Sequence, residues 1–324
     1  MVPWFIGAYA ALPGDARDPQ MEQRLLERFS AVPEFSGWEI PYDSELHPHG
    51  EEWFRAHPTS RAELVVTLIP GVVRRLDTDP SFGLASQDED GRRRAVSIVA
   101  DVFAAIRQLE ELVGRPVVRA VELHSSPRPN VGSSGHSLRE SLLEIAGWYW
   151  RTTRLLVEHC DAAIPGQSPS KGFLNLEEEL DVMAEVNKNL ESPVHCLVNW
   201  GRSAIERRDS RTPIDHIRLA RSGGLLGGVI FSGCSDRPDS RGGAWADMHV
   251  PPRSEIPGAE HSLLDKESIR ASLRAIGDAS TLTVFGMKIS TPPTASLKDR
   301  EEIVRRANDA ILTPARRRPR QLSG

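Results

Sequence analysis

Short apolar runs alternate with amphipathic segments along nearly the whole chain. The apolar runs predict eight strands, at residues 4–9, 37–41, 64–69, 117–124, 155–159, 193–199, 225–231 and 282–288. Apolar residues at helical spacing predict helices at 21–32, 92–113, 137–148, 176–190, 213–222, 266–276 and 297–312. The pattern is therefore one of strands and helices in regular alternation.

The strand runs are continuously apolar, which is typical of parallel strands that are covered by helices. Eight strands in 324 residues, seven of them followed by a predicted helix, predict an α/β fold of one closed (β/α)8 TIM barrel. A doubly wound open sheet is the alternative, but the chain has neither a Gly-x-Gly-x-x-Gly turn after the first strand nor a Gly-x-x-x-x-Gly-Lys-Ser/Thr loop. We expect the barrel to occupy residues 1–313 and a basic, disordered tail to occupy 314–324. The long segments 41–61, 71–91 and 232–262 follow strands and would cap the C-terminal face of the barrel.

The composition restricts the class of protein and its expected cellular compartment. With 39% hydrophobic and 26% charged residues, the chain has the content of an ordinary globular protein. It contains no run of the about 18 apolar residues that a membrane-spanning helix needs, and it begins without a basic leader. These features predict a cytoplasmic protein with no membrane partner. Its three cysteines, Cys160, Cys196 and Cys234, are widely spaced and predict buried, reduced thiols.

Charge argues against a nucleic-acid partner. The formal net charge is −5, but four arginines near the C-terminus, at 316, 317, 318 and 320, contribute positively. Residues 1–315 therefore carry 36 basic against 45 acidic side chains. A body of this sign repels a phosphate backbone.

Polar residues at the ends of the predicted strands are the candidates for chemistry, because the C-terminal ends of barrel strands surround the active site. Glu122 and His124 lie two residues apart and so share one face of their strand, whereas His159 points away from the face that carries Glu158. The complete set is Glu39, Glu122, His124, Glu158, His159, Asp161, Asn199, Trp200, Arg202, the segment 232–237 and Lys288. Acids and bases of this kind could bind and protonate a polyhydroxylated substrate.

Three segments resemble a known family: Gly-Trp-Glu-Ile-Pro at 37–41, Leu-Val-Glu-His at 156–159 and Asn-Trp-Gly-Arg-Ser-Ala-Ile-Glu at 199–206. With the strand order, they make most of the chain similar to the xylose isomerase-like TIM barrels. That family includes sugar isomerases, sugar epimerases, inosose dehydratases and apurinic endonucleases. The resemblance implies a metal-binding glutamate on strand five, and Glu158 matches it.

Other positions depart from the family pattern. The resemblance implies Asp-x-x-His after strand six, but this chain has Asn199 and Arg202 there. It also implies a histidine on strand seven and a glutamate on strand eight, where this chain has Phe231 and Lys288. Glu158 is thus the one family-matching ligand, and the aligned set is a poor site for a divalent cation.

Two arrangements remain open for the cofactor. Glu122, His124, Glu158 and His159 could together hold a divalent metal such as Mn, Zn or Mg. Alternatively, the protein uses no metal, and Arg202 or Lys288 binds an anionic group or polarises a carbonyl. No cofactor follows with certainty from the sequence.

The resemblance and the polar residues together predict a sugar isomerase/epimerase-like enzyme that moves a proton on a carbohydrate or sugar acid. The predicted catalytic residues are Glu122, Glu158 and His124, and the predicted substrate-binding residues are Glu39, Asn199, Trp200, Arg202, Lys288 and His249. The expected partner is a small carbohydrate, with an anionic group as one option, and a homo-oligomer is left open. Alternatives are a metal-independent sugar lyase or dehydratase, Schiff-base chemistry at Lys288, and a sugar-binding barrel without catalysis. An endonuclease is disfavoured by the acidic body.

Overall fold

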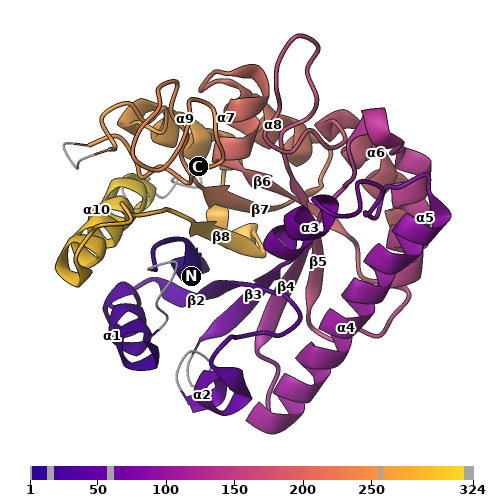
Figure 1. Ribbon diagram of the computed structural model, residues 1–324, viewed down its shortest axis with the longest axis horizontal. Coiled ribbons are helices and arrows are strands. Elements are labelled where there is room, and N and C mark those ends of the chain that lie inside the picture. The colour runs from indigo at the N-terminus through magenta and orange to yellow at the C-terminus, as the bar shows by residue number, and fades with distance from the viewer. Residues whose placement is uncertain (1, 13–17, 57–61, 255–257, 317–324) are drawn as a thin grey trace, which may run out of the picture.

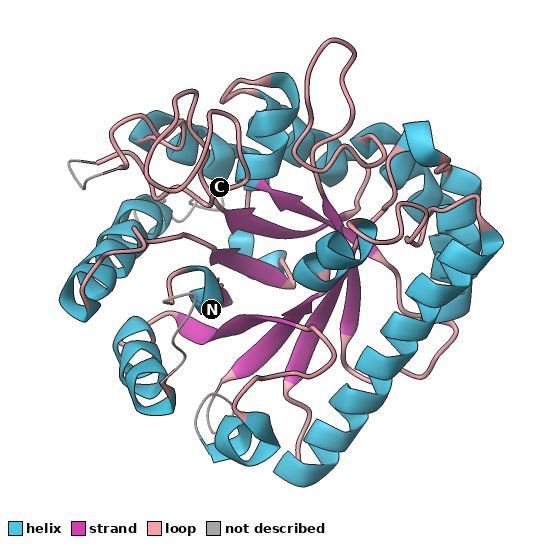
Figure 2. Ribbon diagram, viewed as in Figure 1, coloured by secondary structure: helices cyan, strands magenta, loops and turns pink. Residues whose placement is uncertain are grey.

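Eight parallel strands close into one barrel, as the sequence predicted. The computed structural model describes residues 2–12, 18–56, 62–254 and 258–316. The strands are β1 Trp4–Ile6, β2 Phe35–Pro41, β3 Glu63–Thr67, β4 Val118–Leu123, β5 Arg154–His159, β6 His195–Asn199, β7 Leu226–Phe231 and β8 Val284–Met287. Each strand pairs in parallel with its neighbours in chain order, and β8 pairs with β1 to complete the barrel. Figures 1 and 2 show the helices arranged outside these strands.

The α-helices lie between successive strands and after the last. They are α1 Pro19–Phe29, α2 Gly50–Ala56, α3 Ile69–Leu76, α4 Glu89–Val113, α5 Gly135–Ala146, α6 Leu176–Val186, α7 Trp200–Arg207, α8 Thr212–Ser222, α9 Lys266–Ile276 and α10 Leu297–Arg316. The described residues also form the short 3-10 helices η1 Ala8–Ala10, η2 Pro129–Val131, η3 Asn187–Asn189 and η4 Ala279–Thr281. None of the described helices is long and apolar enough to cross a membrane.

Three helices were missed by the hydrophobic pattern. Both α2 and α7 have only seven or eight residues, which is too short for a clear helical period. Helix α3 contains Pro70 and Gly71, which were expected from the sequence to end the strand at 64–69; strand β3 in fact ends at Thr67. Because proline fits the first turn of a helix, Pro70 lies in the first turn of α3 rather than in a loop.

Element ends also differ from the sequence prediction. Strand β1 stops at Ile6, and the predicted continuation to Tyr9 is the 3-10 turn η1. Helix α10 continues to Arg316, so residues 314–316, expected in the tail, are helical. The remainder of the expected tail, 317–324, lies outside the described residues. Cys160, Cys196 and Cys234 are free and buried, as expected.

The barrel interior contains an apolar layer that supports the polar residues above it. This layer consists of Phe5, Val65, Ala120, Leu156, Leu197, Ile230 and Val284, which form a cluster separate from the larger core between barrel and helices. Side chains alternate along a strand, so the residue two positions further on points to the same interior. The apolar layer therefore determines which residues face the C-terminal mouth.

Candidate functional site

The interior positions above the apolar layer are mostly polar. They are Glu39 on β2, Thr67 on β3, Glu122 on β4, Glu158 on β5, Asn199 on β6 and Ser232 after β7, with His124 and Lys288 just beyond β4 and β8. All eight are buried. The structure thus brings together most of the residues that the sequence singled out, in one buried ring at the mouth of the barrel.

Glu158 is the centre of this ring. Its Oε2 lies 2.6 Å from Arg202 Nη1 and 2.8 Å from His124 Nε2. Its Oε1 accepts a hydrogen bond of 3.0 Å from Asn199 Nδ2 and lies 3.9 Å from Lys288 Nζ. Burial alone would raise the pKa of Glu158, but the charges of Arg202 and Lys288 hold that pKa well below its ordinary value. Glu158 is therefore an ionised carboxylate with every oxygen engaged.

Arg202 is brought to Glu158 by the start of α7. Asn199 ends β6 and caps this helix, because its Oδ1 accepts from the Arg202 backbone N–H. Arg202 then lies in the first turn of α7 with its guanidinium buried. The helix cap at Asn199 therefore also fixes the position of Arg202 next to Glu158.

Lys288 contributes the second cation. Its ammonium is paired with Glu39 and lies 5.6 Å from the centre of the Tyr9 ring. Burial opposes the charge on Lys288, yet Glu39, Tyr9 and Glu158 together raise its pKa well above the ordinary value. Lys288 is therefore held as an ammonium, which does not favour the Schiff-base alternative, since that chemistry needs a neutral amine.

Glu122 differs from Glu39 and Glu158 because it forms no ion pair with any cation of the described residues. Among the described residues, no hydrogen bond of normal geometry reaches either of its carboxyl oxygens. Burial, followed by the nearby charges of Glu39 and Glu158, raises its pKa well above the ordinary value. The environment of Glu122 therefore favours its protonated form, which can donate a proton.

This state of Glu122 makes a testable prediction about stability. A pKa that is higher in the folded protein stabilises the fold at low pH, and that stabilisation is lost as pH rises through the folded pKa. The Glu122→Gln side chain is neutral at every pH. As pH rises, the free energy of unfolding of this variant should therefore increase relative to that of the wild type. Urea unfolding from weakly acidic to alkaline pH measures the difference. The matched control is Glu177→Gln on the exposed side of α6, and a flat difference for Glu122→Gln would contradict the prediction.

His124, two residues after Glu122, is a candidate proton acceptor. An ionised Glu158 only accepts hydrogen bonds, so His124 Nε2 must carry the hydrogen in their 2.8 Å contact. Burial lowers the pKa of His124 despite the opposing influence of Glu158, so the ring is neutral. Its Nδ1 then has a free lone pair, and it meets no hydrogen-bond partner among the described residues.

The part of the chain after β7 that the structure describes, residues 232–254, brings Asp247 to the mouth. Asp247 Oδ2 accepts a 3.0 Å contact from Arg202 Nε and one of 3.1 Å from Lys171 Nζ. Burial would raise the pKa of Asp247, but Arg202 and Lys171 hold it well below its ordinary value. Asp247 was not singled out from the sequence, because nothing local marks it as a partner of Arg202.

His249, a predicted substrate-binding residue, lies beside Asp247 in the same segment. Its Nδ1 is 2.8 Å from Ser232 Oγ and 3.3 Å from Asp247 Oδ1. Burial lowers its pKa to about 3, with Asp247 acting in the opposite sense. His249 is therefore a neutral ring at the edge of the site.

Two candidates do not reach the mouth. Trp200 packs in the core outside the barrel, where its Nε1 donates to Ser272 Oγ at 3.0 Å. It is therefore not placed to stack on a sugar, contrary to the predicted substrate contact. His159 faces the surrounding helices, where it contacts Glu179 and Glu206. It cannot share a metal with Glu158, because adjacent strand residues point to opposite faces.

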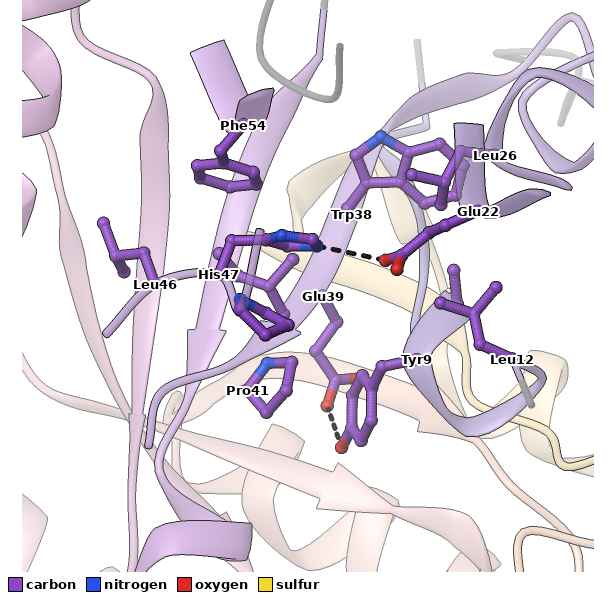
Figure 3. A pocket seen from close by; sticks show the side chains of 13 residues that line it. Tyr9, Leu12, Glu22, Leu26, Trp38, Glu39, Pro41, Leu46, His47 and Phe54 are labelled. Carbon is purple, nitrogen blue, oxygen red and sulfur yellow. Dashed lines mark hydrogen bonds and ion pairs between the residues drawn. The ribbon is translucent and has the colours of Figure 1, made fainter. Parts of the chain in front are cut away.

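A small cavity adjoins the ring beside β1 and β2. Figure 3 shows the Tyr9–Glu39 contact and the His47–Glu22 contact on this same cavity. The Tyr9 hydroxyl donates to Glu39 Oε1 at 3.4 Å, whereas Glu39 Oε2 has no hydrogen-bond partner among the described residues. Tyr9 was missed because the sequence placed it within a strand rather than in the turn after it.

The metal that the xylose isomerase-like resemblance implies does not fit this mouth. Its family-matching ligand, Glu158, is already bound by Arg202, His124 and Asn199. The β8 position holds the Lys288 ammonium, which would repel a divalent cation rather than bind it. The mouth instead carries two fixed organic cations.

Comparison with known proteins identifies relatives of the whole chain. The model of the family described as Domain of unknown function (DUF4862) matches residues 5–303. A protein of Salmonella typhimurium, "Uncharacterized protein STM3670", is 32% identical over 319 residues, covering 97% of this chain and 98% of the relative.

Solved structures share the fold at low sequence identity. A D-psicose 3-epimerase has a TM-score of 0.58 at 15% identity, covering 96% of this chain and 99% of the other. A sugar phosphate isomerase/epimerase of Parabacteroides distasonis has a TM-score of 0.55 at 8% identity, covering 98% and 99%. A xylose isomerase-like TIM barrel fused to a 4-hydroxyphenylpyruvate dioxygenase has a TM-score of 0.57 at 10% identity, with 97% of this chain on 42% of the fusion. The chain belongs to the family described as Domain of unknown function (DUF4862), built on the xylose isomerase-like TIM-barrel fold.

Proposed function

We propose that this protein is a sugar-processing enzyme of the isomerase/epimerase type, which moves a proton on a carbohydrate or sugar acid without a metal in the barrel mouth. The observation that carries the proposal is the placement of two buried titratable groups on one side of the chain, Glu122 near the end of β4 and His124 just beyond it. Burial raises the pKa of Glu122 and lowers that of His124, which favours an acid role for the first and a base role for the second. Two titratable groups whose environments shift their pKa values in opposite directions are candidates for the acid and the base of a reaction. The epimerase and isomerase structures of the same fold support this class.

His124 is the proposed proton acceptor. Its Nε2 donates to ionised Glu158, which fixes the tautomer and stabilises the imidazolium that forms when Nδ1 takes a proton from substrate carbon. Glu122 is the proposed donor, which returns a proton to the substrate. Both groups are buried, so bulk water does not compete for the reacting carbon during the transfer.

Arg202 and Lys288 supply the positive charge that such a reaction needs. Removing a proton beside a carbonyl places negative charge on the carbonyl oxygen, and fixed cations stabilise that charge in a buried site. Both cations border Glu158, so they surround one position at the mouth. The same two groups would bind the carboxylate or phosphate of an anionic sugar.

Glu158 takes a different role in this scheme from the proton exchange that the sequence suggested. A carboxylate whose pKa is held so low by Arg202 and Lys288 is a weak proton acceptor. We assign it to orienting His124 and Arg202. Asp247 holds the other side of the Arg202 guanidinium, so an anionic group of the substrate that binds Arg202 would compete with Asp247 for it.

Proton exchange with solvent tests the proposal without knowledge of the natural substrate. We expect the protein in D2O to introduce deuterium beside the carbonyl of at least one member of a panel of ketoses, aldoses, sugar acids and sugar phosphates, as followed by NMR. Glu122→Gln and His124→Gln should each slow exchange by at least about 100-fold, since each removes one proton-transfer group.

The control for these variants is His195→Gln, because His195 begins β6 at the opposite end of the barrel. It should exchange at the wild-type rate. Binding of a panel member without exchange or conversion would overturn the proposal in favour of a sugar-binding barrel. Exchange that survives both Glu122→Gln and His124→Gln would remove these residues from the chemistry.

A further inference from the structure

A second buried cluster of ligating side chains lies outside the barrel, between β5 and the helices that cover it. It joins His159 at the end of β5, Glu206 on α7 and His216 on α8. His159 Nε2 lies 3.0 Å from Glu206 Oε2, and His216 Nε2 lies 3.6 Å from Glu206 Oε1. One nitrogen of each histidine is therefore directed at the same carboxylate.

The other nitrogen of each histidine is held by a second partner. His159 Nδ1 lies 2.7 Å from Glu179 Oε2, and His216 Nδ1 lies 3.0 Å from Ser203 Oγ. Glu179 is in turn hydrogen-bonded by the Ser125 hydroxyl. Histidines that bind metals typically have the second ring nitrogen oriented by a carboxylate or another oxygen in this way.

We propose that this cluster is a zinc site, in which His159 Nε2, His216 Nε2 and a Glu206 oxygen bind one Zn²⁺ and water completes the coordination. The three ligand atoms lie within 4.8 Å of one another, which small side-chain movements reduce to the spacing of a tetrahedral site. Glu206 and Glu179 supply two carboxylates to balance a divalent cation. The mouth of the barrel, in contrast, has its carboxylate occupied by organic cations.

The location indicates a structural and positioning role. On β5, His159 directly follows Glu158, and on α7, Glu206 lies one turn after Arg202. The pair His159–Glu206 thus repeats, on the outer face, the connection that Glu158–Arg202 makes on the inner face. An ion shared by His159 and Glu206 would hold α7 against β5, and with it the guanidinium of Arg202.

Zinc binding to the full-length protein tests this inference independently of any sugar substrate. After treatment with EDTA and removal of the chelator, we expect the wild type to retain about one equivalent of added Zn²⁺ by elemental mass spectrometry. Its melting temperature should rise on zinc addition, because an ion that binds only the folded state stabilises it. His216→Ala should reduce the zinc affinity by at least about tenfold and remove most of that rise.

Two further variants keep the outcome interpretable. Glu206→Gln preserves the shape and the acceptor for the Ala162 N–H while removing the anionic ligand, and it should also lose affinity. Glu158→Gln, which changes the mouth alone, should retain zinc. The inference is overturned if folded wild type takes up no zinc, if His216→Ala binds it as tightly as wild type, or if the loss follows Glu158→Gln. Deuterium exchange is measured separately, so either proposal can fail alone.

Discussion

Lys288→Met is expected to lower the free energy of unfolding by about 3–5 kcal/mol and to slow substrate proton exchange by about 100-fold or more. Lys288 is buried at the centre of the mouth, in contact with Glu39 and 3.9 Å from Glu158. Without the ammonium, Glu39 is left as a buried carboxyl group with no counter-charge, which is more costly than the absence of the pair. Urea unfolding and the NMR exchange assay measure the two effects.

A double variant separates charge balance from packing. In Glu39→Gln/Lys288→Met, both members of the pair are neutral, so we expect more than half of the lost stability to return while exchange stays low. Lys298→Met, at an exposed position in the first turn of α10, is the control for removing a lysine. If Lys288→Met has the same free energy of unfolding as the wild type, the Lys288–Glu39 pair is not needed to stabilise the buried Glu39.

Gly37→Ala is expected to prevent the barrel from closing. A Cβ at this position would lie 1.9 Å from the Glu63 carbonyl oxygen and 2.7 Å from its carbonyl carbon. Both atoms belong to the backbone of β3, which pairs with β2 at this point, so the neighbour cannot rotate away. The loss should exceed about 4 kcal/mol, as for other substitutions that force backbone atoms apart.

Thermal unfolding followed by circular dichroism measures this effect, together with the soluble yield. Gly243→Ala is the matched control, because a Cβ there meets nothing within 4 Å, and its melting temperature should stay close to that of the wild type. A Gly37→Ala protein that melts at the wild-type temperature would contradict the close approach of β2 and β3.

Much of the fold could be predicted because strands and helices are indicated by patterns among residues that are close together in the sequence. The apolar strand runs and the helical face of 92–113 are read directly from the order of residues, and they correspond to the strands of the barrel and to α4. The same period of two placed Glu122 and His124 on one face, and it set His159 opposite Glu158. The order of the strands and the alternation of side chains along each strand were therefore enough to predict most of the residues that form the ring.

The partners of these residues could not be predicted. Asp247 approaches Arg202 from 45 positions along the chain, through an excursion with no regular period. Trp200 looked suited to a sugar face, but its direction depends on α9, which supplies Ser272. Contacts of this kind are decided by how separate elements pack.

The sequence by itself determined that this chain is an eight-fold strand–helix repeat with charged residues at the strand ends, since spacing and polarity are properties of neighbouring residues. Only the tertiary structure decided the charge states. Glu122 and Glu158 are the same residue type on adjacent strands, but the pKa of Glu122 is raised well above its ordinary value and that of Glu158 is held well below it. The difference arises because Arg202 and Lys288 reach Glu158 in the folded chain, whereas at Glu122 burial and the charges of Glu39 and Glu158 outweigh the influence of Lys288.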